Sequence, residues 1–183
     1  MYVAMLRGIN VGSRNRVAMS ELRAVVESLG YGDVRTYVQS GNVVFSGSGR
    51  TTIVAGRLSV AVRDELGVDA PVVVRTGREM AEILRTSPFI ADGLHPDDEP
   101  TAFHVTFLAD VPDAGRWDAV AAGAERFAPD VCRLVGADVH LHVPGGRYSD
   151  SKLTNAYFEK KLSVTATTRN WRTVVVLAEM AAG

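Results

Sequence analysis

The sequence has only one cysteine, Cys132, so the chain cannot form an internal disulfide. A lone cysteine is typical of proteins that stay in a reducing compartment. No apolar run approaches the ~20 residues that a helix needs to span a bilayer. Met1 is followed directly by a strand-like segment rather than by a secretory signal. We therefore expect a cytoplasmic protein with no membrane partner.

A large excess of charge of one sign is also lacking, because the formal net charge is −1. Bulk charge therefore does not indicate a nucleic-acid or membrane partner. The chain is 46% hydrophobic and 22% charged, as globular proteins are, and this composition excludes global disorder. Its 183 residues fit one large domain or two smaller ones.

The charges are nevertheless unevenly distributed. Residues 1–18 contain three arginines and no acid, and residues 144–172 contain six basic and two acidic residues. Residues 77–138 contain twelve acidic and five basic residues. Two interpretations remain open: the charges lie on solvated faces that happen to segregate, or the two basic ends meet and form one positive surface.

Hydrophobic periodicity predicts a strand–helix–strand–strand–helix–strand order in the first half. A short turn at Ser40-Gly41 predicts a hairpin. This order is that of a ferredoxin-like split βαβ unit. The expected strands are residues 2–7, 34–39, 42–46 and 71–76, and the expected helices are residues 19–29 and 52–66.

Most of this order recurs in the second half. A Thr76–Glu79 capping pair predicts a helix start, and the loop 87–99 is the best candidate for a linker. Further strands are expected at residues 101–108, 131–135 and 139–143, and helices at residues 113–127, 151–162 and 168–180. The expected core includes Leu22, Val26, Leu58, Val62, Phe103, Phe107 and Trp117.

We therefore predict an α+β fold, built as a duplication of two ferredoxin-like units with C-terminal helices. The first unit is expected at residues 1–76 and the second, with the C-terminal helices, at residues 77–183. We expect the two units to form one compact body.

The loop 7–16 carries the first candidate site, because it follows a strand and holds Arg7, Asn10, Arg14 and Arg16. Glycines in this loop let backbone amides approach a ligand, and arginines bind phosphate or carboxylate as a fork. The spacing and the lysine of a Walker A loop are missing. The alternative is an ordinary polar connection.

Two further segments carry polar groups that suit a ligand. Gln39 and Asn42 flank the predicted hairpin turn, where they either contact a ligand or satisfy the turn backbone. Thr168 is a candidate N-cap, which places Arg169 and Asn170 in the first helical turn. Free amides and the positive end of the helix dipole attract anions there.

Four segments together resemble the family catalogued as domain of unknown function 1697. They are residues 6–12 (LRGINVG), 37–45 (YVQSGNVVF), 151–153 (SKL) and 168–171 (TRNW). The resemblance covers nearly the whole chain and implies a fold of two ferredoxin-like units. It implies no activity. The chain departs from the family at Ser13, where a further glycine is frequent, and at Val175-Val176, where a lysine is frequent before the leucine.

A metal site receives little support. His140 and His142 share one face of a predicted strand, and His104 lies on a strand that could neighbour it, so the three could cluster in a zinc geometry. No carboxylate or cysteine is placed to complete such a site. We expect no metal and no cofactor, and the histidines to be solvated or covered by a helix.

The residues favour binding over catalysis. We expect a phosphate-bearing or other anionic ligand, either a small molecule or a nucleic acid. The expected ligand-binding residues are Arg7, Asn10, Arg14, Arg16, Gln39, Asn42, Lys152, Arg169 and Asn170. One alternative is an enzyme that acts on an anionic small molecule, although no general acid or base is evident near this cluster. Another is a protein-interaction module, which a large exposed apolar patch favours. The sequence leaves the oligomeric state open.

Overall fold

The computed structural model describes residues 1–12 and 15–183. The chain divides into two compact units. Unit 1 comprises Met1–Ala81 and Leu177–Gly183, and unit 2 comprises Glu82–Val176. Within the described residues, no helix is both long enough and apolar enough to cross a membrane.

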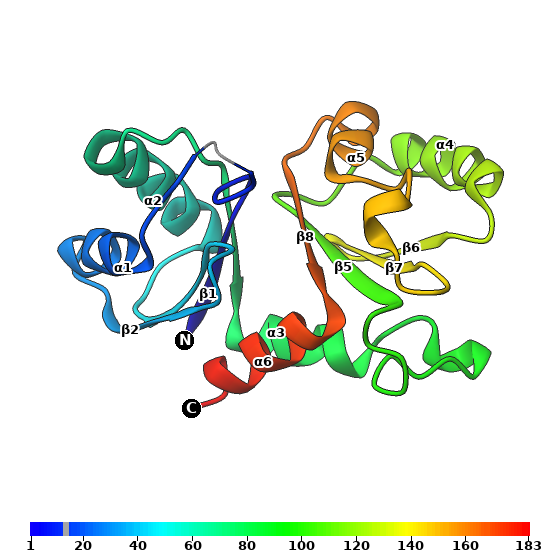
Figure 1. Cartoon of the computed structure of the whole chain (residues 1–183), viewed down its shortest axis with the longest axis horizontal. Helices are drawn as coiled ribbons and strands as arrows, with labels where there is room; N and C mark the ends of the chain where they lie inside the picture. The colour runs from blue at the N-terminus through cyan, green and yellow to red at the C-terminus, as the bar shows by residue number, and fades with distance from the viewer. Residues whose placement is uncertain (13–14) are drawn as a thin grey trace. The chain divides into compact units, whose positions relative to one another are not determined.

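Unit 1 is built on a four-stranded sheet in which every neighbouring pair is antiparallel. The strands are β1 (Tyr2–Leu6), β2 (Gly32–Tyr37), β3 (Asn42–Ser46) and β4 (Val72–Thr76), in the order β2-β3-β1-β4. Helices α1 (Met19–Ser28) and α2 (Thr51–Leu66) cover one face of the sheet (Figure 1). Their apolar stripes bury Leu22, Val26, Leu58 and Val62 against the strands, as predicted.

Unit 2 repeats this arrangement. Its strands are β5 (Phe103–Leu108), β6 (Val131–Val135), β7 (Asp138–His142) and β8 (Ala166–Asn170), in the antiparallel order β6-β7-β5-β8. Helices α4 (Ala114–Ala124) and α5 (Asn155–Leu162) pack on one face of this sheet (Figure 1). Short 3-10 turns occur at η1 (Ile90–Asp92), η2 (Glu125–Phe127) and η3 (Tyr148–Asp150).

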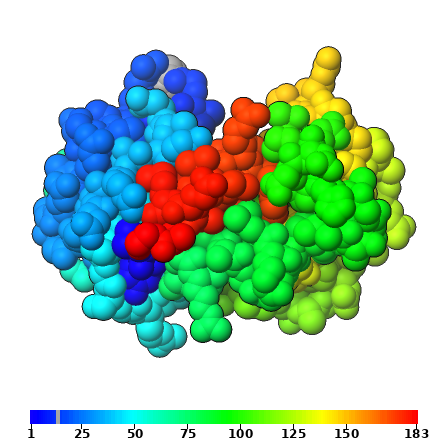
Figure 2. Space-filling view, turned by 90° about the horizontal axis from the view of Figure 1, so that it is seen from below, coloured from blue at the N-terminus to red at the C-terminus, as the bar shows by residue number. Residues whose placement is uncertain are grey.

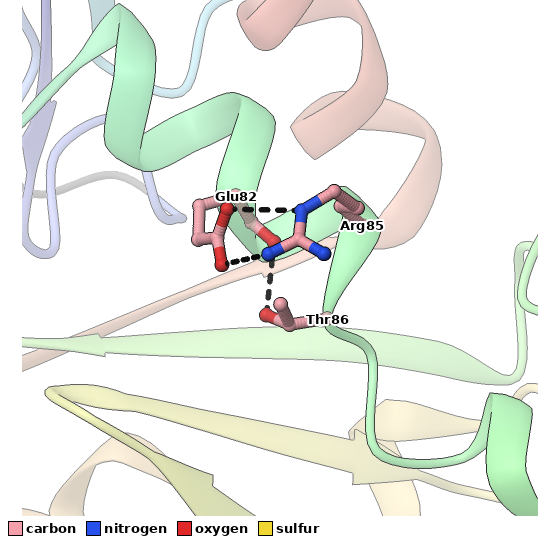
Figure 3. Close-up of polar contacts among 3 residues, drawn as sticks. All are labelled: Glu82, Arg85 and Thr86. Atoms are coloured by element: carbon pink, nitrogen blue, oxygen red, sulfur yellow. Dashed lines mark hydrogen bonds and ion pairs between the residues drawn. The ribbon is translucent and has the colours of Figure 1, made fainter.

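Helix α3 (Gly77–Arg85) follows β4 directly. The predicted capping pair is confirmed, because the Glu79 carboxylate accepts from the backbone N–H of Thr76 at 2.6 Å and the Thr76 hydroxyl accepts from the backbone N–H of Glu79 at 3.2 Å. At the other end Arg85 donates twice to the Glu82 carboxylate, at 2.5 and 3.1 Å (Figure 3). Figure 3 also shows the Thr86 hydroxyl donating to the Glu82 carbonyl oxygen, which satisfies a carbonyl in the last turn.

Helix α6 (Trp171–Ala181) ends in unit 1. The Arg35 guanidinium donates to the carbonyl oxygen of Met180 at 2.7 Å. A Cβ on Gly77 would lie 2.5 Å from the carbonyl oxygen of Ala181, so α3 begins directly against the end of α6. Figure 2 shows this last part of the chain, in red, beside the blue segments of unit 1.

The end of the chain corrects the sequence analysis. Residues 168–170 belong to strand β8, not to a helix, and the helix begins at Trp171. The helix expected at residues 151–162 begins only at Asn155. Strand β2 begins and ends two residues earlier than expected.

Two packing expectations also change. Trp117 is only partly buried, although Phe103 and Phe107 are buried as predicted. The loop 87–99, expected as a linker, lies within unit 2, where Phe89 is 2% exposed. Phe89 stacks edge-on against Phe103, with ring centroids 5.6 Å apart, so an aromatic anchor holds this loop.

Candidate functional site

The Asn10 side chain connects the loop that follows β1 to the β2–β3 turn. Its side-chain Nδ2 donates to the carbonyl oxygens of Val17 (2.9 Å) and Gln39 (2.8 Å), and its Oδ1 accepts from the backbone N–H of Val17 (2.9 Å). Asn10 adopts a left-handed conformation (φ 53°) that asparagine tolerates better than most residues. The side chain therefore positions the loop against the β2–β3 turn.

The β2–β3 turn is equally constrained. The Asn42 side chain is fully buried and donates to the Ser40 hydroxyl at 2.9 Å and to the Tyr37 carbonyl oxygen at 3.3 Å. Gly41 has φ 72°, and a Cβ there would lie 2.7 Å from the Ile9 side chain. Its carbonyl oxygen accepts from the backbone N–H of Leu6 at 2.9 Å. The turn and the loop therefore meet at one rim of the sheet, as the topology predicts.

A small pocket opens at this rim. Its volume is about 290 Å³, and it is lined by Asn10, Gly12, Arg16 and Gln39. Arg16 and Gln39 are exposed, and their side chains have no hydrogen-bond partner among the described residues. The structure therefore brings together three of the predicted ligand-binding residues, and two of them have donors available for a ligand.

The other predicted residues of unit 1 have different roles. Arg7 is partly buried, and its backbone N–H donates to the carbonyl oxygen of Pro71 at 2.8 Å. The Asn42 side chain donates its hydrogen bonds within the β2–β3 turn. Arg14 lies outside the described residues.

The three predicted residues of unit 2 have positions unlike those expected. Arg169 lies in β8 and donates to the Thr167 hydroxyl (2.8 Å) and the Thr168 carbonyl oxygen (2.9 Å). Asn170 is the residue before α6, and its Oδ1 accepts from the backbone N–H of Thr173 at 2.8 Å. It therefore caps the helix in place of Thr168. Lys152 is exposed in the loop between η3 and α5.

The position of Arg169 in β8 does not support the anion site expected at a helix N-terminus. Arg169 does not lie in the first turn of a helix, so the helix dipole does not act on its guanidinium as expected. The β-branched pair Thr167-Thr168 was the available sequence signal for a strand here.

A partly buried polar network around Thr168 was not expected from the sequence. The Thr168 hydroxyl lies 2.7 Å from that of Thr106, accepts from the Tyr148 hydroxyl at 3.1 Å, and donates to the side-chain Oδ1 of Asn155 at 2.7 Å. These residues come from β8, β5, η3 and α5. The strand register places Thr106 opposite Thr168, and η3 and α5 bring Tyr148 and Asn155 to the same hydroxyl. The network ties the edge strand to the helical layer.

The histidines do not cluster. His104 stacks on Tyr148, with ring centroids 4.5 Å apart, on the helix-covered face of the sheet. His140 pairs with Val105 in the sheet register, and therefore lies on the opposite face from His104. No group of three potential metal ligands occurs among residues 1–12 and 15–183.

Burial sets the protonation of several groups in unit 2. It lowers the pKa of both His104 and His140 to about 4, so both rings are neutral at neutral pH. It raises the pKa of the Cys132 thiol to about 11, which keeps that thiol protonated and poorly nucleophilic. None of these groups lines the pocket of unit 1.

Comparison with known families decides where this chain belongs. The family described as "Protein of unknown function (DUF1697)" matches residues 1–140. The chain belongs to this family. The match includes the pocket of unit 1 and ends within β7, so the Thr168 network extends beyond the matched residues.

One solved structure shares the architecture of this DUF1697 chain. It is that of the conserved bacterial protein SP0830 from Streptococcus pneumoniae, with a TM-score of 0.69 and 22% sequence identity. The match covers 98% of this chain and 97% of that chain. At this identity the likeness shows the fold alone. No curated protein matches the chain.

Proposed function

We propose that this DUF1697 protein binds a phosphate-bearing or other anionic ligand at the pocket of unit 1. The observation that carries the proposal is the exposed Arg16 guanidinium beside Gln39 in a pocket whose wall is fixed by Asn10. A guanidinium gives an anion charge-assisted hydrogen bonds, and Gln39 adds an amide donor and acceptor. Residues 1–18 contain no acidic side chain to compete for Arg16.

The same pocket supports binding better than catalysis. Its described lining contains no Asp, Glu, His or Cys, and general acid–base catalysis needs a titratable group within hydrogen-bond reach of the substrate. The hydrogen bonds of Asn10 fix one wall of the pocket, and a preorganised wall loses little entropy when the ligand binds.

Lys152, Arg169 and Asn170 lie in unit 2, and a shared site with the loop of unit 1 stays a prediction. So does the division of the chain into two ferredoxin-like copies. The identical strand order of the two sheets, β2-β3-β1-β4 and β6-β7-β5-β8, supports that duplication.

The test is a binding titration with pyrophosphate, ATP and a short single-stranded oligonucleotide. Arg16→Ala is expected to weaken binding of the preferred compound by about tenfold or more, because a charge-assisted hydrogen bond contributes ~1.5–3 kcal/mol. The matched control is Arg78→Ala, which removes an exposed arginine of α3 outside the pocket. It is expected to leave the affinity unchanged.

The salt dependence separates the ligand classes. An oligonucleotide that contacts several phosphates loses affinity steeply as salt rises, whereas a small anion loses less. Equal losses in Arg16→Ala and Arg78→Ala, or no binding of any of the three compounds to the wild type, would refute the proposal.

A further inference from the structure

A second surface of unit 1 has no role in the proposed ligand site. The outer side of α2 forms an apolar groove of about 620 Å³ with Leu29, which follows α1. Ile53 and Val60, two of its lining residues, are 59% and 46% exposed. Large aliphatic side chains with this exposure are stabilised when another surface covers them.

The groove follows one stripe of the helix. Ile53, Gly56 and Val60 recur at spacings of three and four, so they line one side of α2, away from the buried Leu58 and Val62. A Cβ built on Gly56 would meet nothing within 4 Å. The glycine therefore leaves a gap in the stripe that lets a second helix backbone approach closely.

Most of the charges at the ends of α2 have the wrong sign for α2 itself. Arg50 is its N-cap residue and no acid lies in its first turn, whereas the last turn carries Asp64 and Glu65 beside one arginine, Arg63. Cations at the N-terminus and anions at the C-terminus oppose the helix dipole. In an antiparallel pair of helices this opposition becomes favourable. Arg50 then lies beside the C-terminus of the neighbouring helix, and Asp64 and Glu65 lie beside its N-terminus.

We propose that a second copy of this chain docks antiparallel on α2, around a two-fold axis between Gly56 and Arg57. Such an axis sets Ile53 opposite Val60 of the second copy, and Arg50 beside Asp64 of the second copy. Each contact occurs twice, as an isologous interface requires. The apolar stripe is self-complementary in shape, and the Arg50–Asp64 pair is complementary in charge, and together these identify the occupant.

Two local contacts agree with this arrangement. Arg57 donates to the Leu29 carbonyl oxygen at 3.2 Å and lies over the Tyr31 ring at 5.5 Å, which holds its charge at the side of the groove. Among the described residues, Asp64 pairs with its neighbour Arg63 at 3.1 Å, and both side chains are more than half exposed. Such an exposed pair is weak, so Asp64 can exchange it for Arg50 of the second copy.

The experiment is sedimentation of the full chain over a concentration series into the millimolar range. The wild type is expected to dimerise, and Ile53→Arg and Gly56→Leu are each expected to raise the dissociation constant at least tenfold. Arg50→Asp is expected to weaken the dimer, and Arg50→Asp combined with Asp64→Arg is expected to restore it. Val111→Arg alters a valine of unit 2 that is 64% exposed and serves as the control.

Circular dichroism checks that each variant is folded, and Gly56→Leu is expected to fold because a Cβ at this position meets nothing within 4 Å. A wild type that stays monomeric throughout the series overturns the proposal. So does a dimer that persists in both Ile53→Arg and Gly56→Leu, one that Val111→Arg weakens equally, or a charge exchange that restores nothing.

Discussion

His104 and His140 show how far one residue's environment can depart from its sequence pattern. The alternation of residues along the two strands does not decide whether the two rings share one face of the sheet. The strand register places them on opposite faces of one sheet. His104 is 8% exposed and His140 is 2% exposed, and neither His104 Nδ1 nor His140 Nε2 has a hydrogen-bond partner among the described residues. Neither ring is placed as a metal ligand, and both are sensitive to protonation.

We expect both histidines to destabilise the protein in acid. The folded pKa of about 4 lies below the ordinary value of 6.5. Between these two pH values the unfolded chain therefore binds protons that the folded chain does not, and stability is lost as the pH falls. The loss approaches ~3 kcal/mol for each ring at the acid end of this range.

The measurement is the free energy of unfolding in urea from pH 7.5 to 4.5. His104→Phe keeps an aromatic ring stacked on Tyr148, and His140→Leu replaces the imidazole with an apolar side chain of similar size. Each is expected to flatten the acid dependence relative to the wild type. His95→Asn, at an exposed position, is the control and is expected to keep the wild-type slope. A slope unchanged in both core variants would contradict this explanation.

At the scale of the element, the first half of the chain was predictable because its segments carry their own signals. The run Val72-Val73-Val74 is apolar enough to indicate a buried strand, and the stripe of Leu58 and Val62 indicates a helix face. The position of Gln39 on the same rim of the sheet as the loop could be predicted from the strand topology. The hydrogen bonds of Asn10 could not be predicted, because the conformation of the folded loop decides which backbone carbonyls lie within reach.

Strand β8 was not predictable in the same way. It is a short, polar edge strand, Ala-Thr-Thr-Arg-Asn, and it pairs only with β5, about 60 residues earlier in the chain. The amphipathic pattern of α6 begins immediately afterwards, and that pattern extends the expected helix backwards over β8. The pairing of β8 with the distant strand β5 therefore outweighs the local preference of residues 168–170 for a helix.

The boundary between β8 and α6 gives a direct test. Asn170→Ala removes the acceptor for the Thr173 N–H and is expected to cost about 1 kcal/mol of stability. Asn170→Asp retains an acceptor at the N-cap and is expected to keep most of that stability. Chemical denaturation measures both variants. Equal losses in the two would show that Asn170 does not cap α6.

At the scale of the whole molecule, the division between the two units falls inside two helices. It separates Ala81 from Glu82 within α3, and Val176 from Leu177 within α6. Neither junction is a flexible linker of glycine, serine or proline. A helix is cooperative along its length, so unfolding of one unit is expected to fray a helix that also belongs to the other.

We therefore expect the two units to unfold in one transition. Both tryptophans, Trp117 and Trp171, lie in unit 2, so intrinsic tryptophan fluorescence reports on that unit, whereas far-ultraviolet circular dichroism reports on both. Leu177 is fully buried in unit 1, and Leu177→Ala is expected to cost ~2–5 kcal/mol. Because α3 and α6 couple the two units, Leu177→Ala should lower the midpoint of the fluorescence transition as much as the midpoint of the dichroism transition.

The matched variant is Leu162→Ala, which truncates a leucine in the core of unit 2. Its two transitions should also coincide with each other, because coincident probes are the signature of two-state unfolding. If the units unfolded independently, Leu177→Ala would shift part of the dichroism signal to lower denaturant and leave the fluorescence midpoint in place. Continuous helices argue against that outcome, since loss of the Leu177 contacts removes the support for the same helix that carries Trp171.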